Sequence, residues 1–241
     1  MQAVLLRVGI DTGSGGILGP LFKNGSFEFV PIWDQFRKIG VSKQTYGNTR
    51  GRYGGRLLLD YFPERFRKKR RDTPVHFDPE FQTFTYGDPT VLKSGLRKLK
   101  KGDLLIFYAG LEGWDFRCEP ALYIIGYFEV EKAGLATAFT PAEIRKAFGR
   151  NFHVRHRAVF EDQKARLVLV KGSKKSRLLR KPRLISKLGK DKSGRPINLL
   201  SPKMQKVFGD FDGHTSIHRA PPRWVYSEFV DKAARFVRSL R

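Results

Sequence analysis

Two carboxylates of this chain stand where they could do acid–base chemistry or accept hydrogen bonds from a ligand. Asp11 follows the first apolar stretch and precedes a glycine-rich segment, and Asp88 closes a Tyr-Gly-Asp-Pro turn. A carboxylate can exchange a proton with a reacting group, and it can accept a hydrogen bond from a ring nitrogen. If the protein is an enzyme, Asp11 and Asp88 are the candidate catalytic residues.

The glycine-rich segment after Asp11 has two possible roles. Asp11, Thr12 and Gly13 spell the triplet of aspartic proteases, but the chain has no second such triplet to complete the carboxylate pair, so a protease is not predicted. The glycine spacing also departs from the dinucleotide-binding fingerprint. What is left is a loop whose backbone N–H groups could approach a phosphate or a base, or else a plain tight turn. The glycines concerned are Gly13, Gly15 and Gly16.

A second polar segment, residues 76–88, reads HFDPEFQTFTYGD. Turn chemistry explains much of it, because Asp-Pro and Tyr-Gly pairs favour tight turns. The functional alternative is a base pocket in which Tyr86 stacks on a base and Asp88 accepts a hydrogen bond, with His76 and Asp78 nearby. The spacing matches no known metal-ligand signature, so we predict neither a metal nor a cofactor. Residues 151–156, NFHVRH, are expected to form a strand with structural histidines.

The charge of the chain points to polyanions. The formal net charge is +24, from 47 Lys and Arg against 23 Asp and Glu. Basic residues concentrate at 65–71 and 171–195, and either cluster could be a solvated surface or a phosphate-binding one. An arginine-rich segment with a tryptophan near the C-terminus could also hold phosphates. The candidate phosphate-binding residues are Arg67, Lys68, Lys69, Lys174, Lys175, Arg177, Arg219 and Arg223.

Cysteine and hydropathy bear on the compartment. Cys118 is the only cysteine, so an intramolecular disulfide and a cysteine-based zinc site are excluded. No apolar run approaches the roughly 20 residues that a membrane span needs. The N-terminus begins directly with a strand-like segment and lacks the features of a signal peptide. We therefore expect a cytoplasmic protein with no membrane partner.

Two apolar runs, 104–109 and 122–130, are predicted to be neighbouring antiparallel strands, because a polar loop with glycine joins them. Gly126 inside the second run indicates a bulge or a close backbone approach. Further strands are expected at 3–10, 27–32, 57–61 and 165–170, with a loop at 40–56. The charge run at 65–71 is either a solvated loop tip or a phosphate-binding segment. Capping signals predict helices at 141–148 and 202–208, and an apolar face predicts one at 227–240.

Several blocks of the chain, in order, resemble the third of the nucleotide-modification-associated domain families. These blocks are RVGIDTGSGG, FTYGDP, the pair GDLLIFYAGL and LYIIGYFEV, LVLVKGSKKSRLL, INLLSP and HRAPPRWV. The strand pair is also similar to the PUA, ASCH and EVE barrels, which bind RNA or modified bases. The resemblance implies a link to base-modified nucleic acid. Residues in matching blocks that could contact a nucleotide are Arg7, Asp11, His76, Asp78, Tyr86, Asp88 and Tyr108.

These observations predict one α+β domain over residues 1–241, a PUA-like, partly open β-barrel flanked by helices, with a basic insertion at about 171–195. The expected function is binding of nucleic acid, DNA or RNA, with recognition of a single base or nucleotide, modified or unmodified, by a pocket where Asp11, Asp88 and Tyr108 converge; the link to base modification suggests a DNA modification context. One alternative is an enzyme acting on a nucleotide or a nucleic-acid base. The other is a structural protein associated with RNA or the ribosome.

Overall fold

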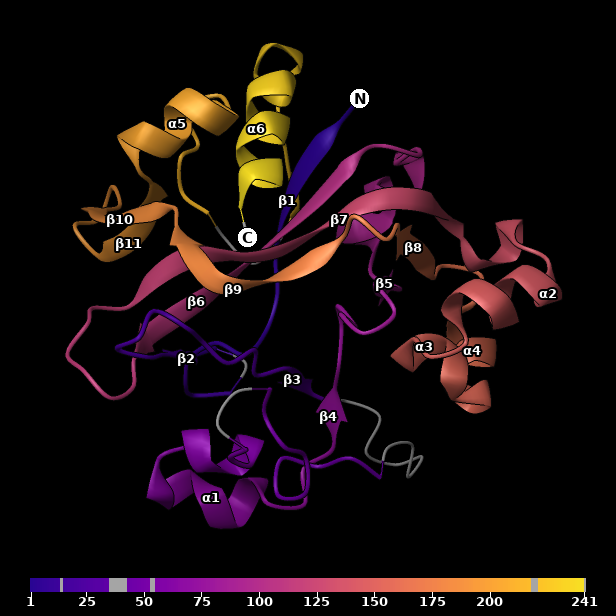
Figure 1. Cartoon of the computed structure of the whole chain (residues 1–241), viewed down its shortest axis with the longest axis horizontal. Coiled ribbons are helices and arrows are strands. Elements are labelled where there is room, and N and C mark those ends of the chain that lie inside the picture. Colours follow the sequence, from indigo (N-terminus) through magenta and orange to yellow (C-terminus); the bar gives the residue numbers. More distant parts are fainter. Residues whose placement is uncertain (14, 35–42, 53–54, 218–220, 241) are drawn as a thin grey trace.

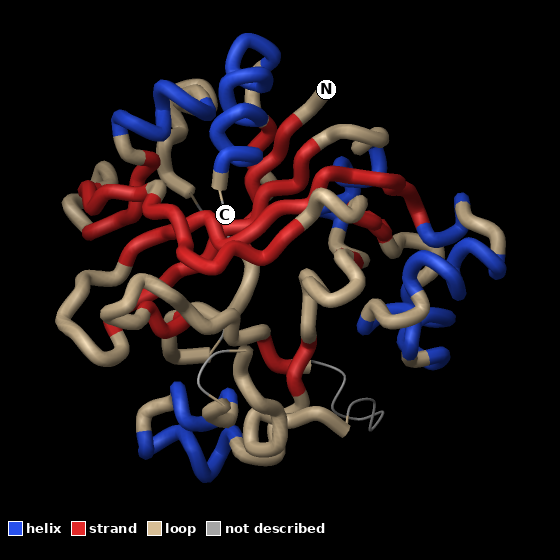
Figure 2. The backbone as a smooth tube through the Cα atoms, viewed as in Figure 1, coloured by secondary structure: helices blue, strands red, loops and turns tan. Residues whose placement is uncertain are grey.

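A large mixed sheet organises the chain, with helices on its upper side and at its right-hand end (Figures 1 and 2). The computed structural model describes residues 1–13, 15–34, 43–52, 55–217 and 221–240. The mixed α+β class predicted from the sequence is confirmed. Among the described residues, no helix is both long and apolar enough to cross a bilayer.

The main sheet joins strands that are far apart in the sequence. Its first strand, β1 (Ala3–Arg7), runs parallel to β6 (Leu104–Gly113), and β6 runs antiparallel to β7 (Ala121–Leu135). Two further strands pair with these: β2 (Gly19–Leu21) pairs with β6, and β9 (Arg177–Leu184) pairs with β7. In spatial order the other strands form the path β12 (Arg223–Trp224), β1, β6, β7, β8 (Val168–Gly172) and β5 (Thr85–Asp88).

The predicted strand pair is confirmed, since β6 and β7 are antiparallel neighbours. Both strands are longer than the apolar runs that predicted them. The expected irregularity at Gly126 is present, because the β6–β7 register shifts between Phe107 and Tyr108, opposite this glycine. A Cβ atom on Gly126 would lie 2.6 Å from the carbonyl oxygen of Arg177 on β9. Only glycine allows the two backbones to approach this closely.

The sheet does not close. One edge of β7 pairs with β6, while its other edge pairs with β9 and then, beyond Val130, with β8. Among the described residues, no pairing joins β5 at one end of the path to β12 at the other. The PUA-like barrel is therefore not confirmed. The physical reason is that β7 changes partners along its length, which bends the sheet without bringing its two ends together.

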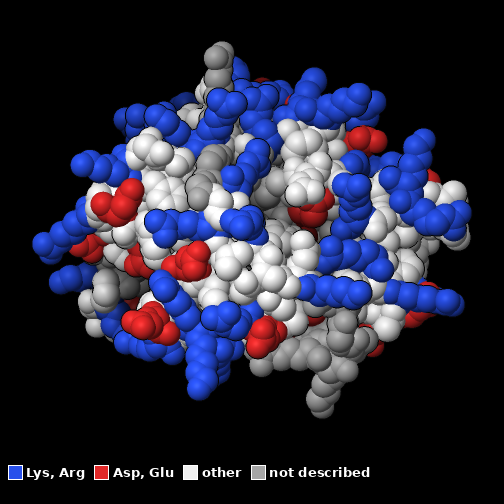
Figure 3. Space-filling model, turned by 60° about the horizontal axis from the view of Figure 1, so that its bottom comes forward, with Lys and Arg blue, Asp and Glu red and all other residues white. Residues whose placement is uncertain are grey.

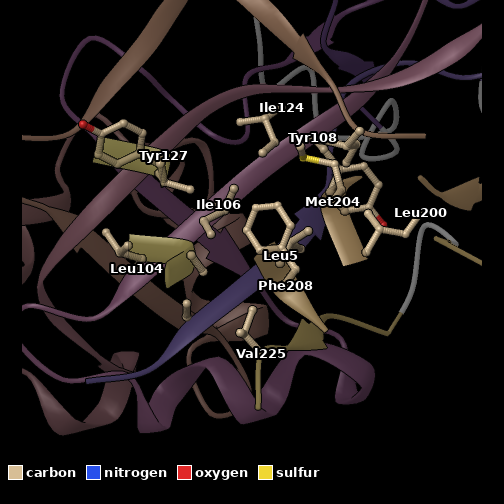
Figure 4. Close-up of a cluster of buried hydrophobic side chains, with 14 of the residues drawn as sticks. Leu5, Leu104, Ile106, Tyr108, Ile124, Tyr127, Leu200, Met204, Phe208 and Val225 are labelled. Carbon is tan, nitrogen blue, oxygen red and sulfur yellow. The ribbon is translucent and has the colours of Figure 1, made fainter. Parts of the chain in front are cut away.

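Alternate residues of the central strands face two different cores. Leu5, Ile106 and Tyr108 belong to the cluster beneath α5 (Pro202–Phe208) and α6 (Ser227–Ser239), which Figure 4 shows. Their neighbours in the sequence point the other way, as strand geometry requires. Helices α5 and α6 match the predicted segments and bury their apolar faces here.

The lower part of the molecule contains β3 (Ile32–Trp33), β4 (Val75–His76), a 3₁₀ helix η2 (Leu58–Tyr61) and α1 (Glu64–Arg70) (Figure 1). One prediction was wrong here. Residues 57–61 were expected to be a strand, but the carboxylate of Asp60 accepts a hydrogen bond from the Leu57 N–H and favours a helical turn. One interpretation of residues 65–71 was a solvated loop tip, but Arg, Lys and Glu have good helix propensity and form α1. Of the predicted strand at 27–32, only its end is part of β3.

The right-hand end of the molecule in Figure 1 is helical. It contains η4 (Ala136–Ala138), α2 (Pro141–Glu143) continuing into the π-helix η5 (Ile144–Phe148), α3 (Phe152–Arg155) and α4 (Arg157–Gln163). The predicted capping box of Thr140 and Glu143 is confirmed. The strand predicted at 151–156 was wrong, because the side chain of Asn151 caps α3 by accepting a hydrogen bond from the His153 N–H.

The basic stretch at 171–195 contributes regular structure. It supplies the end of β8, all of β9 and β10 (Ser186–Lys190), which forms a hairpin with β11 (Pro196–Leu200). Between β5 and β6 lies η3 (Val91–Lys98), a 3₁₀ helix. It buries Leu96 and leaves Val91 and Leu92 exposed.

Candidate functional site

A groove of about 810 Å³ lies where the loop before η2, the turn after β4, the end of α3 and strand β9 meet. This volume falls in the range of about 300–1,000 Å³ that is typical of small-molecule and cofactor sites. Its described lining mixes aromatic, cationic and amide side chains with two acids. The lining residues are Glu28, Phe29, Gln44, Asn48, Thr49, Arg50, Gly51, Arg52, Leu58, Phe77, Pro79, Glu80, Phe81, Gln82, Gly149, Arg150, Arg155 and Leu178.

Three phenylalanines, Phe29, Phe77 and Phe81, form the aromatic part of the groove. Phe81 is held by edge-to-face contacts, with its ring centroid 5.6 Å from that of Phe29 and 5.6 Å from that of Phe107 in the core. Phe77 packs at the boundary of two core clusters and is half-buried. Rings that are anchored in this way and still line a groove can present a face to a planar ligand, because their rotamers are fixed by packing.

Four arginines give the groove its charge. Arg50, Arg52, Arg150 and Arg155 line it and are exposed. Arg52 and Arg150 make no ion pair with any residue that the structure describes. Of the two acids, Glu80 is occupied locally, since its carboxylate accepts hydrogen bonds from Gln82 and Thr83. The groove therefore offers several guanidinium groups to an anion such as a phosphate.

Directly behind this groove lies a buried cluster of His76, Asp78 and His153. Nε2 of His153 is 3.5 Å from Oδ2 of Asp78, and Nε2 of His76 is 4.0 Å from the same oxygen. One possible ligand atom from each residue lies within 4.8 Å of the others. The three side chains are 9%, 6% and 3% exposed, respectively. Phe77 and Pro79, on either side of Asp78, reach the groove, so the cluster and the groove share one short segment.

Local structure explains how the cluster forms. Strand β4 pairs with β3 and fixes His76, while the Asn151 cap fixes the first turn of α3, which carries His153. Strand β5 supplies Gly87, whose N–H donates to both carboxylate oxygens of Asp78, at 3.0 and 3.2 Å. A Cβ atom on Gly87 would lie 2.9 Å from Cδ2 of His153, so glycine is required for this approach.

Hydrogen bonding and protonation within the cluster are uneven. Nδ1 of His153 lies 2.7 Å from Oε1 of Gln163, but Nε2 of His76 is buried and has no hydrogen-bond partner among the described residues. A buried polar atom without a partner costs about 1–3 kcal/mol. Burial, helped by the nearby charges of His153 and Arg155, lowers the pKa of His76 well below its ordinary value, so this imidazole is neutral. Burial raises the pKa of Asp78 to about 6, although hydrogen bonds from His153 and Gly87 oppose the shift.

The predicted pair Tyr86 and Asp88 is found together on β5. The hydroxyl of Tyr86 donates to Asp88 at 3.0 Å, and Asp88 also accepts from the Thr90 N–H at 2.8 Å and from Nζ of Lys93 at 2.6 Å. Burial favours the protonated form of Asp88, but the charge and hydrogen bond of Lys93 outweigh it and lower the pKa. The ring of Tyr86 is buried in the core. Asp88 is thus ionised, and every hydrogen bond described for its carboxylate comes from a neighbouring residue of the protein.

The other members of the predicted pocket lie elsewhere. Tyr108 is 1% exposed and packs in the cluster under α5 and α6, on the opposite face of the sheet from Tyr86. Asp11 follows β1, with Oδ2 3.9 Å from a guanidinium nitrogen of Arg7. The structure therefore brings Tyr86 to Asp88 and Arg7 to Asp11, but it separates Tyr86 from Tyr108.

The glycine loop is packed against its neighbours. A Cβ atom on Gly15 would lie 2.2 Å from the side chain of Ile10, and Gly16 has a positive φ of 77°. Gly16 also lies near the ring of Phe66 on α1, and Gly13 lies near the carboxylate of Asp11. These contacts place the loop beside α1, and none of its described glycines lines the groove.

The predicted phosphate-binding residues fall on separate surfaces. Lys68 and Lys69 are exposed on α1, whereas Arg67 donates to the carbonyl oxygens of Phe62 and Asp60 and so anchors that helix. On the turn before β9, Lys175 pairs with Glu129 at 3.4 Å. The remaining members are Lys174 on the same turn, Arg177 over the ring of Tyr127, Arg223 on β12 donating to Ser216, and Arg219, which lies outside the described residues.

Basic side chains are nevertheless widespread. On the face in Figure 3, Lys and Arg spread over most of the surface, with fewer Asp and Glu between them. Leu178 of β9 lines the groove, so the basic strand β9 borders it. An extended polyanion could therefore meet positive charge on more than one side of the groove.

Sequence reasoning missed most of the groove. It treated residues 40–56 as a loop without a role, although this segment supplies Arg50 and Arg52. It considered metal ligands only within residues 76–88 and did not combine them with His153. The signal that could have found the groove was the density of arginine in that loop, because binding residues are often on loops and arginine binds anions such as phosphate.

The class that the fold and the site define is a mixed α+β protein with an arginine- and phenylalanine-lined groove beside a buried His-Asp-His cluster. The family model of nucleotide modification associated domain 3 matches residues 2–239, so the chain belongs to this family. The resemblance inferred from the sequence blocks is confirmed. Comparisons with curated proteins and with solved structures give no match.

Proposed function

We propose that the protein binds nucleic acid and recognises one base or nucleotide in the groove described above. The observation that carries this proposal is the combination in one groove of anchored aromatic rings with exposed arginines. A nucleotide needs both, because its base is planar and apolar on its faces while its phosphate is anionic. Membership of a family associated with nucleotide modification supports a modified base as the recognised group.

Phe77 and Phe81 would supply the stacking surface. Stacking of a base on an aromatic side chain contributes about 1–3 kcal/mol per base and tolerates any sequence. Phe81 is the better anchored of the two, since it contacts the rings of Phe29, Phe107 and Phe128. A ring that is already immobilised loses little conformational entropy when a base stacks on it.

Arg52 and Arg150 would hold phosphates. Guanidinium groups bind phosphate oxygens through paired, charge-assisted hydrogen bonds. Such contacts fix the register of the ligand without reading its sequence. The amide of Gln82 also lines the groove and can pair with a base edge, so it is the proposed source of base preference. The amide of Asn48 lines the groove too, but it accepts from the Thr45 N–H and donates to the carbonyl oxygen of Lys43, so it holds the turn.

Photocrosslinking tests this placement. A short single-stranded oligonucleotide that carries 4-thiouridine would be bound to the protein, irradiated and mapped by mass spectrometry of the peptides. We expect crosslinks on the segment that contains Phe77 and Phe81, because a stacked thiobase lies in contact with these rings. Crosslinks confined to α1 or to the β10–β11 hairpin would refute the groove as the base site.

A further inference from the structure

We propose that His76, Asp78 and His153 bind a divalent transition-metal ion. Two imidazoles and one carboxylate form a ligand set that zinc and iron(II) accept in proteins. The inference goes beyond the nucleotide groove, and it can succeed or fail independently of that proposal.

The geometry of the three residues suits a small metal ion. Nitrogen ligands at about 2.0–2.1 Å from a tetrahedral zinc lie roughly 3.4 Å from each other. His153 Nε2 and Asp78 Oδ2 are already 3.5 Å apart, and His76 Nε2 is 4.0 Å from the same oxygen. Since all three ligand atoms lie within 4.8 Å of one another, small side-chain rotations would bring them onto one ion.

The partnerless nitrogen of His76 argues for a ligand. His76 is 7% exposed, and its Nε2 atom is on the side of Asp78 and has no hydrogen-bond partner among the described residues. A purely structural hydrogen-bond network would be expected to satisfy this atom, because buried polar atoms almost always have partners. A metal ion between His76 and Asp78 would supply what the nitrogen lacks.

The surroundings orient the other two ligands as metal sites usually do. Oε1 of Gln163 lies 2.7 Å from Nδ1 of His153, so Nδ1 can donate to it. With that proton on Nδ1, metal binding displaces any proton from Nε2, and the Nε2 lone pair is directed at the ion beside Asp78. The Gly87 N–H holds the carboxylate of Asp78 at 3.0 and 3.2 Å. Metal-binding histidines almost always donate their second ring N–H to an oxygen in this way, which fixes the tautomer.

The donor set also selects against the abundant hard cations. Magnesium and calcium bind six or more oxygen ligands, whereas this cluster offers two nitrogens and one carboxylate. Three protein ligands leave one position of a tetrahedral ion for another donor. We therefore expect zinc to bind and magnesium to fail to compete with it.

Calorimetric titration of the full-length protein tests the proposal. Bound metal would first be removed from the protein with a chelator, and the chelator would then be removed. The metal-free protein would be titrated with zinc chloride, in the presence and absence of excess magnesium. We expect one zinc ion to bind per chain, whether or not magnesium is present. Absence of stoichiometric zinc binding by the wild-type protein would overturn the proposal.

Variants locate the ion. We expect His76→Gln and Asp78→Asn to weaken zinc binding at least tenfold, and Gln163→Leu to weaken it about 10- to 100-fold by releasing His153. His156→Gln is the matched control, because His156 lies three residues after His153, just beyond α3, but outside the cluster. Equal affinity in His76→Gln and His156→Gln would overturn the assignment of the site.

X-ray absorption of the zinc-loaded wild-type protein reports the ligands without any substitution. We expect the scattering pattern of two imidazoles and an oxygen donor. A spectrum without imidazole scattering would overturn the proposal, even if the variants failed to fold. Nucleotide binding by the metal-free protein is a separate measurement, so a failed metal site and a failed nucleotide groove can be told apart.

Discussion

Nε2 of His153 lies 3.5 Å from Oδ2 of Asp78, which joins the first turn of α3 to the segment that follows β4. These two segments are far apart in the sequence, and each continues into the groove. Phe77 and Pro79, which flank Asp78, line the groove, and so does Arg155, two residues after His153. The buried contact thus sets the relative position of an aromatic wall and a cationic wall.

The close approach of β5 to α3 can be tested with Gly87→Ala. Its Cβ atom would lie 2.8 Å from Oδ1 of Asn151 and 2.9 Å from Cδ2 of His153, so α3 must shift. We expect the free energy of unfolding to fall by about 1–3 kcal/mol, as for other overpacked sites. Urea denaturation measures this. In the control Gly95→Ala, the nearest atom is at 3.5 Å, and no loss is expected. Equal effects of both substitutions would contradict the packing described.

The core to which β6 and β7 contribute gives a second prediction. Leu105 and Ile125 are both 0% exposed. Replacing either by alanine should lower the free energy of unfolding by about 2–5 kcal/mol through lost burial and a cavity. The same substitution at Leu188, which is 69% exposed, should change it by less than about 0.5 kcal/mol. Comparable unfolding midpoints for all three variants would show that the strands are not the core.

Asp88 and Lys93 make stability depend on pH. The pKa of Asp88 is lowered in the folded protein, so its contribution is fully present above the unfolded value of about 3.9 and is lost as the pH falls through the folded value. Asp88→Asn should therefore destabilise the protein by about 1–3 kcal/mol at neutral pH. The difference from the wild type should shrink progressively below about pH 4. A difference that stays constant over denaturation series from neutral to acid pH would contradict the ion pair.

The exposed lysines of α1 are predicted to add affinity without specificity. Since Arg67 also anchors α1 through Phe62 and Asp60, Lys68→Ala with Lys69→Ala is the cleaner variant. If these lysines contact phosphates, binding should weaken alike for all sequences. The salt slope should decrease by up to about 0.9 for each lost duplex contact. Fluorescence anisotropy at several salt concentrations checks this, and a loss confined to one sequence would argue against it.

Parts of the fold could be predicted because local signals dominate them. The apolar runs gave β6 and β7, the Thr140 capping box gave α2, and the apolar face at 227–240 gave α6. Asn151 was misassigned because alternation over a few residues resembles a strand, whereas its side chain caps a helix.

The site was harder to predict because its parts are remote in the sequence. No local pattern links His76 to His153, and the contact depends on Gly87 of a third segment. Tyr108 appeared to end a strand near a loop, but strand alternation turns it toward α5 and α6. Whether a ring faces a core or a ligand depends on which surface is covered, and this is a property of the whole fold.

The central claim is that the groove, and not the overall charge, holds the nucleotide. Arg150 and Arg145 form a charge-matched pair, since both are exposed arginines, Arg145 within η5 and Arg150 two residues after its end, but only Arg150 lines the groove. The most direct measurement compares Arg150→Ala with Arg145→Ala in anisotropy titrations of a short labelled single-stranded oligonucleotide at fixed salt. A hydrogen bond to a charged group contributes about 1.5–3 kcal/mol, so its loss in Arg150→Ala should raise the Kd at least tenfold. Arg145→Ala should stay close to the wild type. Equal Kd values for the two variants would contradict the account.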